Sequence, residues 1–85
     1  MDDKGLKNVF RMLDELANDI SVPRNIRRGA KEAKEILMRK DETLDVKVAS
    51  AISRLDELLN DPNIPTHGRT AIWNIMSALE SLSAG

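Results

Sequence analysis

The sequence predicts an all-α protein: an antiparallel, up-and-down four-helix bundle made of two helical hairpins. Apolar residues recur at helical spacing along four segments, and no segment shows the two-residue alternation of a strand. The connections between the segments are short, which makes consecutive helices antiparallel neighbours. A chain of 85 residues without cysteine has the length of a single domain, residues 1–85, that folds without disulfide bonds. The helices are expected at about residues 5–18, 23–39, 43–60 and 65–82.

One stretch of sequence occurs twice, 42 positions apart. Residues 13–27 read LDELANDISVPRNIR, and residues 55–69 read LDELLNDPNIPTHGR. Each copy has the pattern of a helix end, a short polar turn and a new helix opened by proline. The repeat therefore predicts two equivalent hairpins whose turns lie at the same end of the bundle. The recurring turn residues are Asn18, Asp19, Pro23 and Arg27 in one copy, and Asn60, Asp61, Pro65 and Arg69 in the other.

The first two predicted helices carry clear apolar stripes. We expect Asn18 to leave the first helix in a left-handed conformation. The core face of the second helix is built from small residues beside Gly29, which lets a neighbouring helix approach closely. The expected core residues are Leu6, Val9, Phe10, Leu13, Leu16 and Ala17, followed by Ile26, Ala30, Ala33 and Leu37 with Met38 beside them.

Residues that start or stop helices flank the third helix and open the fourth. Asp41 or Thr43 can cap the third helix, Pro62 ends it, and Pro65 opens the fourth. The core face of the fourth helix carries large side chains where that of the second carries small ones. Such complementary sizes let the side chains of a core interdigitate. The expected core residues are Val48, Ala51, Ile52, Leu55, Leu58 and Leu59, followed by Ile72, Ile75, Met76, Leu79 and Leu82.

The repeat unit also resembles a HEAT-type repeat, which has two helices in a similar length. A solenoid needs about three units to bury its faces, so we prefer the closed bundle and keep two HEAT-like repeats as the alternative. In each copy the turn aspartate precedes an arginine by eight residues, as Asp19 precedes Arg27 and Asp61 precedes Arg69. We expect each aspartate to pair with an arginine of its own or of the other copy.

The overall charge is nearly balanced. Thirteen Lys and Arg against fourteen Asp and Glu give a net charge of −1, which is not typical of a general nucleic-acid or membrane binder. The N-terminus lacks the apolar run of a signal peptide, and no apolar run approaches the ~20 residues of a membrane span. We expect a soluble, cytoplasmic protein that does not associate with a membrane.

The second helix is locally basic. Residues 23–40 carry seven bases against two acids, a charge of +5, and residues 41–61 carry −4. Four of the bases share one face near a helix N-terminus, where they could contact a phosphate or an RNA backbone. These are Arg24, Arg27, Arg28 and Lys31.

A solvated face paired with its own acids explains the same pattern, and we favour this explanation. Arg28–Glu32 and Lys31–Glu35 have the spacing of ion pairs on a helix. No aromatic residue is interleaved in this helix to stack bases, which weakens the RNA interpretation.

Trp73 lies beside the apolar stripe of the fourth helix, and we expect it to be half-exposed. Tryptophan is enriched where proteins meet, so Trp73 and Met76 are candidates for an interface. A tryptophan lying across the edge of the bundle is an equally good explanation.

Metal binding and catalysis have little support. Asp19, Asp61 and His67 could be imagined as metal ligands, but they have no short-range ligand spacing and turn formation explains the aspartates. His67 has no evident nucleophile partner, and the chain has neither a cysteine nor a glycine-rich phosphate loop. We therefore expect no enzyme activity, no cofactor and no metal.

Nearly the whole chain resembles a short archaeal family that carries only an uncharacterised-protein-family label. The segments LDELANDISVPRNIRRGAKEAKE, VKVASAISRLDEL and DPNIPTHGRTAIWNI carry the resemblance. It implies a small helical bundle with no assigned activity. The function is thus unknown. We interpret the chain as a non-catalytic interaction module that docks to a protein or to itself. The alternative is an RNA or ribonucleoprotein accessory that uses the basic second helix.

Overall fold

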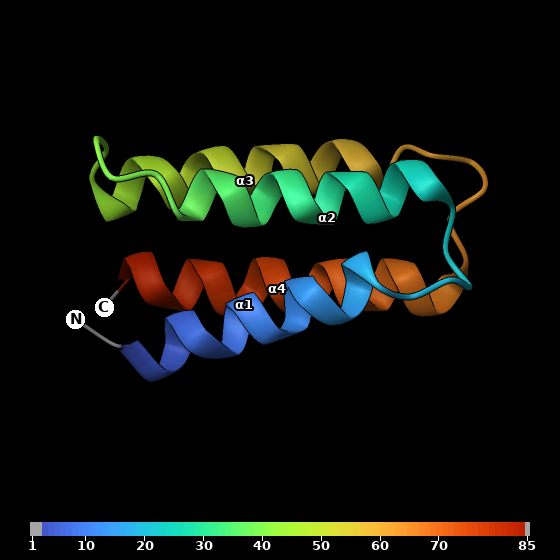
Figure 1. The fold of residues 1–85 in the computed structure, drawn as a ribbon, viewed down its shortest axis with the longest axis horizontal. Coiled ribbons are helices and arrows are strands. Elements are labelled where there is room, and N and C mark those ends of the chain that lie inside the picture. Colours follow the sequence, from blue (N-terminus) through green and yellow to red (C-terminus); the bar gives the residue numbers. More distant parts are fainter. Residues whose placement is uncertain (1–2, 85) are drawn as a thin grey trace.

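The structure, a computed structural model, describes residues 3–84 and consists there of four helices without a strand (Figure 1). The predicted helix bounds agree with the observed ones to within two residues at each end. None of the helices in the described part of the chain is long and apolar enough to cross a membrane. The helices are α1 (Asp3–Ala17), α2 (Arg24–Leu37), α3 (Leu44–Leu58) and α4 (Thr66–Ala84).

The helices close into an up-and-down bundle. α1 packs against α2 and α4, and α3 packs against the same two helices, whereas the diagonal pairs do not meet. Figure 1 shows both repeated turns at one end and the α2–α3 connection at the other. Two stacked HEAT-like repeats would bring α1 against α3 and α2 against α4. The closed bundle is confirmed, and the HEAT-like alternative is wrong.

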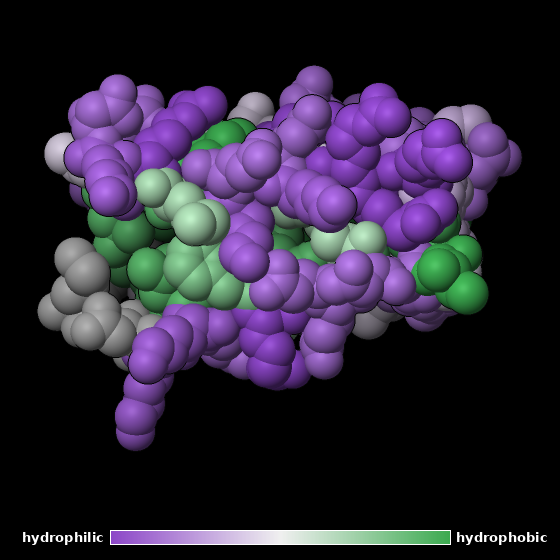
Figure 2. Space-filling view, in the orientation of Figure 1, coloured by the Kyte–Doolittle hydropathy of each residue, from purple (hydrophilic) through white to green (hydrophobic). Residues whose placement is uncertain are grey.

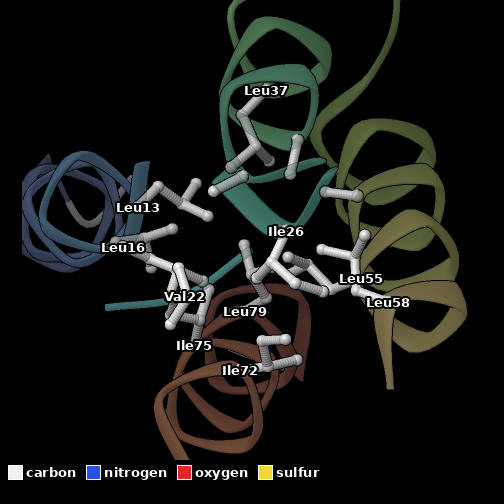
Figure 3. Close-up of a cluster of buried hydrophobic side chains, with 14 of the residues drawn as sticks. Leu13, Leu16, Val22, Ile26, Leu37, Leu55, Leu58, Ile72, Ile75 and Leu79 are labelled. Atoms are coloured by element: carbon white, nitrogen blue, oxygen red, sulfur yellow. The ribbon is translucent and has the colours of Figure 1, made fainter. Parts of the chain in front are cut away.

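The core is aliphatic and runs along the bundle axis, where side chains from all four helices converge (Figure 3). The residues expected on the four core faces are buried or partly buried. Met38 is the exception at 58% exposure, because α2 already ends at Leu37. Two buried hydrophobic residues were not expected: Val22 and Ile64, one from each repeated turn, close the core at the turn end.

The helix ends differ in how their backbone groups are satisfied. Thr43, rather than Asp41, caps α3, because its hydroxyl oxygen accepts a hydrogen bond from the N–H of Val46 at 3.4 Å. The left-handed exit expected at Asn18 is wrong, since no non-glycine residue in the described range has a positive φ. Instead the backbone and side-chain amides of Asn18 both donate to the carbonyl of Asp14, at 3.0 and 2.9 Å, so this carbonyl is satisfied without a left-handed residue.

The small face of α2 lets α3 approach very closely. A Cβ atom added at Gly29 would lie 2.5 and 2.7 Å from the two Cδ atoms of Leu58. Leu58 is only 4% exposed, so its side chain has little room to move away. The missing side chain at Gly29 therefore sets the distance between these two helices.

We expect Gly29→Ala to destabilise the protein by about 1 kcal/mol, because the overpacking against Leu58 outweighs the gain in helix propensity. Gly68→Ala is the matched control. Its added Cβ atom would lie 3.2 Å from Val22 and 3.3 Å from Ile64, so small shifts suffice and stability should change little. Chemical denaturation followed by far-UV circular dichroism measures both variants. A Gly29→Ala variant as stable as the wild type would contradict the close-packing argument.

Candidate functional site

The repeated aspartates close their own turns in the same way. Asp19 Oδ1 accepts a hydrogen bond from the backbone N–H of Ser21 at 2.9 Å, and Asp61 Oδ1 accepts one from Asn63 at 2.8 Å. This pairing with the residue two positions on is an Asx turn. The primary role of both carboxylates is therefore to shape the turn.

Each aspartate also reaches the other hairpin. Asp19 Oδ2 lies 3.5 Å from Nε2 of His67 at the start of α4, and Asp61 accepts a hydrogen bond from the side-chain amide of Asn25 at the start of α2. His67 and Asn25 are themselves 42 residues apart. The two links occupy equivalent sequence positions and join the hairpins at the turn end.

The expected pairing of aspartate with arginine is wrong. Neither Asp19 nor Asp61 forms an ion pair with Arg27 or Arg69 in the described residues. The residue that faces the opposite turn is the second after each proline, and the arginine lies two residues later, about 200° further round the helix. Arg27 is partly buried, and its Nε has no hydrogen-bond partner within the protein.

Ser21 completes the link between Asp19 and His67. Its Oγ lies 2.5 Å from Asp19 Oδ1 and 2.6 Å from His67 Nε2. The hydroxyl has one proton, and when it donates this proton to Asp19 its oxygen can only accept from His67. A nucleophilic serine needs the reverse, with its proton directed at the histidine. This arrangement suits a structural link.

The residues considered as metal ligands do not come together. Asp61 belongs to one link, and Asp19 and His67 belong to the other. Within residues 3–84, no three His, Asp or Glu side chains are placed to hold a metal ion.

The basic residues of α2 are not neutralised by acids of their own helix. Arg24, Arg28 and Lys31 are exposed, and none of them forms an ion pair within the described residues. The expected pairs with Glu32 and Glu35 are absent. Glu32 instead binds Arg54 of the closely packed α3, whose Nε and Nη2 lie 2.7 and 2.6 Å from Oε1. We call Arg24, Arg28 and Lys31 the basic face.

Two acids of neighbouring α1 are already paired. Asp14 binds Lys34 at 2.8 Å, and Glu15 binds Arg11 at 3.1 Å. Figure 2 shows hydrophilic side chains covering the part of this surface where α2 runs. The cations of the basic face thus form no ion pair, and the exposed acid Glu35 lies one turn from Lys31 on the same helix without pairing with it.

Trp73 and Met76 lie together on α4. Trp73 is 52% exposed, as the sequence predicted, and Met76 is partly buried against the core. The positions 42 residues earlier are Lys31 and Lys34 on α2. Equivalent places on the two hairpins therefore carry lysines in one case and large apolar side chains in the other.

Residues 1–82 match the family described as "Uncharacterised protein family (UPF0147)". The chain belongs to this family. Among its archaeal relatives, UPF0147 protein MJ1419 of Methanocaldococcus jannaschii is 55% identical over 75 residues, covering 88% of this chain and 81% of its own. UPF0147 protein Ta0600 of Thermoplasma acidophilum is 49% identical over 82 residues, covering 95% and 93%.

Two solved structures have the same fold as this UPF0147 protein. A UPF0147 protein from Thermoplasma acidophilum superimposes with a TM-score of 0.91 at 46% identity and covers 95% of both chains. A protein of unknown function, MMP1188, gives the same score and identity and covers 95% and 92%. The likeness confirms the helical bundle, and the family description assigns it no activity.

The turn aspartates of this UPF0147 protein have lowered pKa values. Hydrogen bonds from the Ser21 side chain and backbone hold the pKa of Asp19 below its usual range, and the charge of His67 acts in the same direction. The pKa of Asp61 is lowered by the side-chain amide of Asn25 and by the backbone N–H of Asn63. Both shifts favour the ionised carboxylate that the links require.

Sequence reasoning missed the partners in these links. Asn25 and His67 are polar, equivalent under the repeat and two residues past a proline, and this was the available signal. Asn25 and His67 were not predicted as partners because arginine, with its positive charge, is the more obvious partner for an aspartate.

We expect Asp19→Asn/Asp61→Asn to flatten the acid dependence of stability. A carboxyl group whose pKa is lower in the folded state than in the unfolded state stabilises the protein at pH values above its unfolded pKa of about 3.9. This stabilisation is lost as the pH falls through the pKa of the folded state. Asparagine keeps a turn-forming oxygen and does not titrate. Thermal melts should therefore show a smaller loss of Tm from about pH 5 to about pH 2.5.

Asp45→Asn/Asp56→Asn, on the exposed surface of α3, controls for the loss of two negative charges. Identical pH profiles for the wild type and the Asp19/Asp61 variant would contradict the linkage.

Proposed function

We propose that this UPF0147 protein is a non-catalytic, cytoplasmic binding module that contacts the phosphate backbone of RNA through the basic face of α2. The observation that carries the proposal is that Arg24, Arg28 and Lys31 are exposed without ion pairs. A cation that is already paired gains little from a phosphate. An unpaired one releases counterions from the nucleic acid on binding.

The start of α2 supports the same contact. Pro23 precedes the helix, and no side chain caps its first turn. The free N–H groups and the dipole of a helix N-terminus favour a nearby anion. Arg24 and Arg28 lie beside this end of the helix.

The net charge of −1 does not oppose this proposal, because the charges are segregated along the chain. Residues 23–40 carry +5 and residues 41–61 carry −4. A local field of one sign steers an anionic ligand to that surface even when the whole protein is nearly neutral.

A second candidate function is docking to a protein, here a second copy of the chain, through α4. The observation that favours it is the 52% exposure of Trp73 beside partly buried Met76. Burying such a pair at an interface contributes apolar area and a large rigid ring.

For the RNA contact, we expect binding of labelled total RNA to weaken roughly 20- to 40-fold between about 50 and 200 mM salt if about three phosphates are neutralised. Arg24→Glu/Arg28→Glu should abolish this binding. Lys4→Glu/Lys40→Glu is the control for net charge, because both positions are exposed and lie outside the basic face. Equal loss in both variants, or no binding at low salt, would rule out the basic face as the site.

For the docking candidate, we expect the emission of Trp73 to shift to shorter wavelengths as protein concentration rises. The variant Trp73→Lys/Met76→Lys carries at these positions the lysines that α2 has at the equivalent positions. It should sediment as a monomer at all concentrations. Emission and sedimentation that are independent of concentration in the wild type would exclude self-association through α4.

A further inference from the structure

We propose that a hollow on α1 beside Phe10 receives an unpaired RNA base while the flanking phosphates lie on the basic face of α2. This inference rests on the phosphate contact proposed above, and it names single-stranded RNA as the ligand. The hollow lies on α1 and the basic face on α2, and these two helices pack against each other.

The hollow has a volume of about 520 Å³ and is a shallow depression, open to solvent, along α1. Phe10 is partly buried against the core, so its ring is held in place while part of it stays accessible. Figure 2 shows apolar surface between hydrophilic side chains along the seam between the layer of α2 and α3 and the layer of α1 and α4. The hollow is lined by Lys7, Phe10, Arg11, Asp14, Glu15 and Asn18.

Phe10 faces the helix that carries the basic face. The ammonium group of Lys34, on α2, lies 5.8 Å from the centre of its ring. Phe10 therefore lies at the α1–α2 seam with the Lys34 ammonium group over its ring, so a base that stacks there displaces this group, which can then meet the flanking phosphate. The sequence of α2 lacks an aromatic residue, and the packing of α1 against α2 supplies one.

The charges at the hollow do not repel a nucleotide. Its two acids, Asp14 and Glu15, are paired with Lys34 and Arg11. Lys7 is exposed and has no ion pair within the described residues. Unpaired cations beside an aromatic ring are the combination by which proteins bind single strands, with bases stacked on rings and phosphates held by cations.

Trp73 is the other aromatic residue of the chain, and it is less suited to this role. It lies on α4, the neighbour of α3, and residues 41–61, which include α3, carry a net charge of −4. The acidic charge of this neighbouring segment disfavours phosphates beside Trp73, where Arg69, one turn earlier on α4, is the nearby base. Phe10 lies instead between Lys7 and the helix that carries the basic face.

The test compares three labelled probes by fluorescence anisotropy: an oligouridylate of about eight nucleotides, an abasic strand of the same length, and an RNA duplex of about 16 base pairs. Phe10→Leu should weaken binding of the oligouridylate by roughly five- to a hundredfold, as expected for one lost stacked base. Its binding to the abasic strand and the duplex should stay unchanged, since neither offers a free base. Trp73→Leu is the matched control and should bind all three probes as the wild type does.

The outcomes separate the two proposals. Weakening of all three probes by Arg24→Glu/Arg28→Glu, with an unchanged oligouridylate affinity in Phe10→Leu, would support the phosphate contact and overturn the base site. Failure of the wild type to bind any probe would overturn both. Should Phe10→Leu fold poorly, the ring protons of Phe10 in the wild type must shift on addition of oligouridylate and stay unshifted with the abasic strand. The absence of this difference would also overturn the base site.

Discussion

Each hairpin has one aliphatic face, and the other hairpin is the surface on which that face is buried. Equivalent positions of the two copies, such as Leu13 with Leu55 and Leu37 with Leu79, are almost completely buried in the same core. Two units cannot stack into a solenoid with covered faces, so they close on each other. This closure places both turns at one end, and no polar residue of the described range is fully buried. The position of each candidate surface depends on it.

The reciprocal links reinforce the closure at the turn end. Asp19 contacts His67 and Asp61 contacts Asn25, so each turn is attached to the first turn of a helix from the opposite hairpin. Val22 and Ile64 lie buried beneath the same turns. The joining of the hairpins therefore explains the recurring turn sequence.

The two hairpins share a scaffold and differ on their surfaces. Arg54 and Glu32 form an ion pair across α3 and α2, whereas the equivalent positions across α1 and α4 are Met12 and Asn74, which line a groove. Lys31 on α2 likewise corresponds to Trp73 on α4. Equivalent apolar positions of the two sequence copies lie in one core, and the positions at which the copies differ produce one basic surface and one apolar surface. The proposals for RNA and for protein docking both depend on these differences.

The sequence by itself determined the helices, the core faces and the closed bundle, because helical periodicity and proline act locally and apolar faces must be buried. It also placed Trp73 correctly at the edge of the core. The tertiary structure alone decided which charges pair. Glu32 takes Arg54 from another helix and leaves Arg28 free, and Asp61 takes Asn25 in place of an arginine. Spacing along one helix shows which side chains of that helix can meet. Glu32 instead finds its partner on a neighbouring helix, and the close approach of α3 to α2 depends on Gly29.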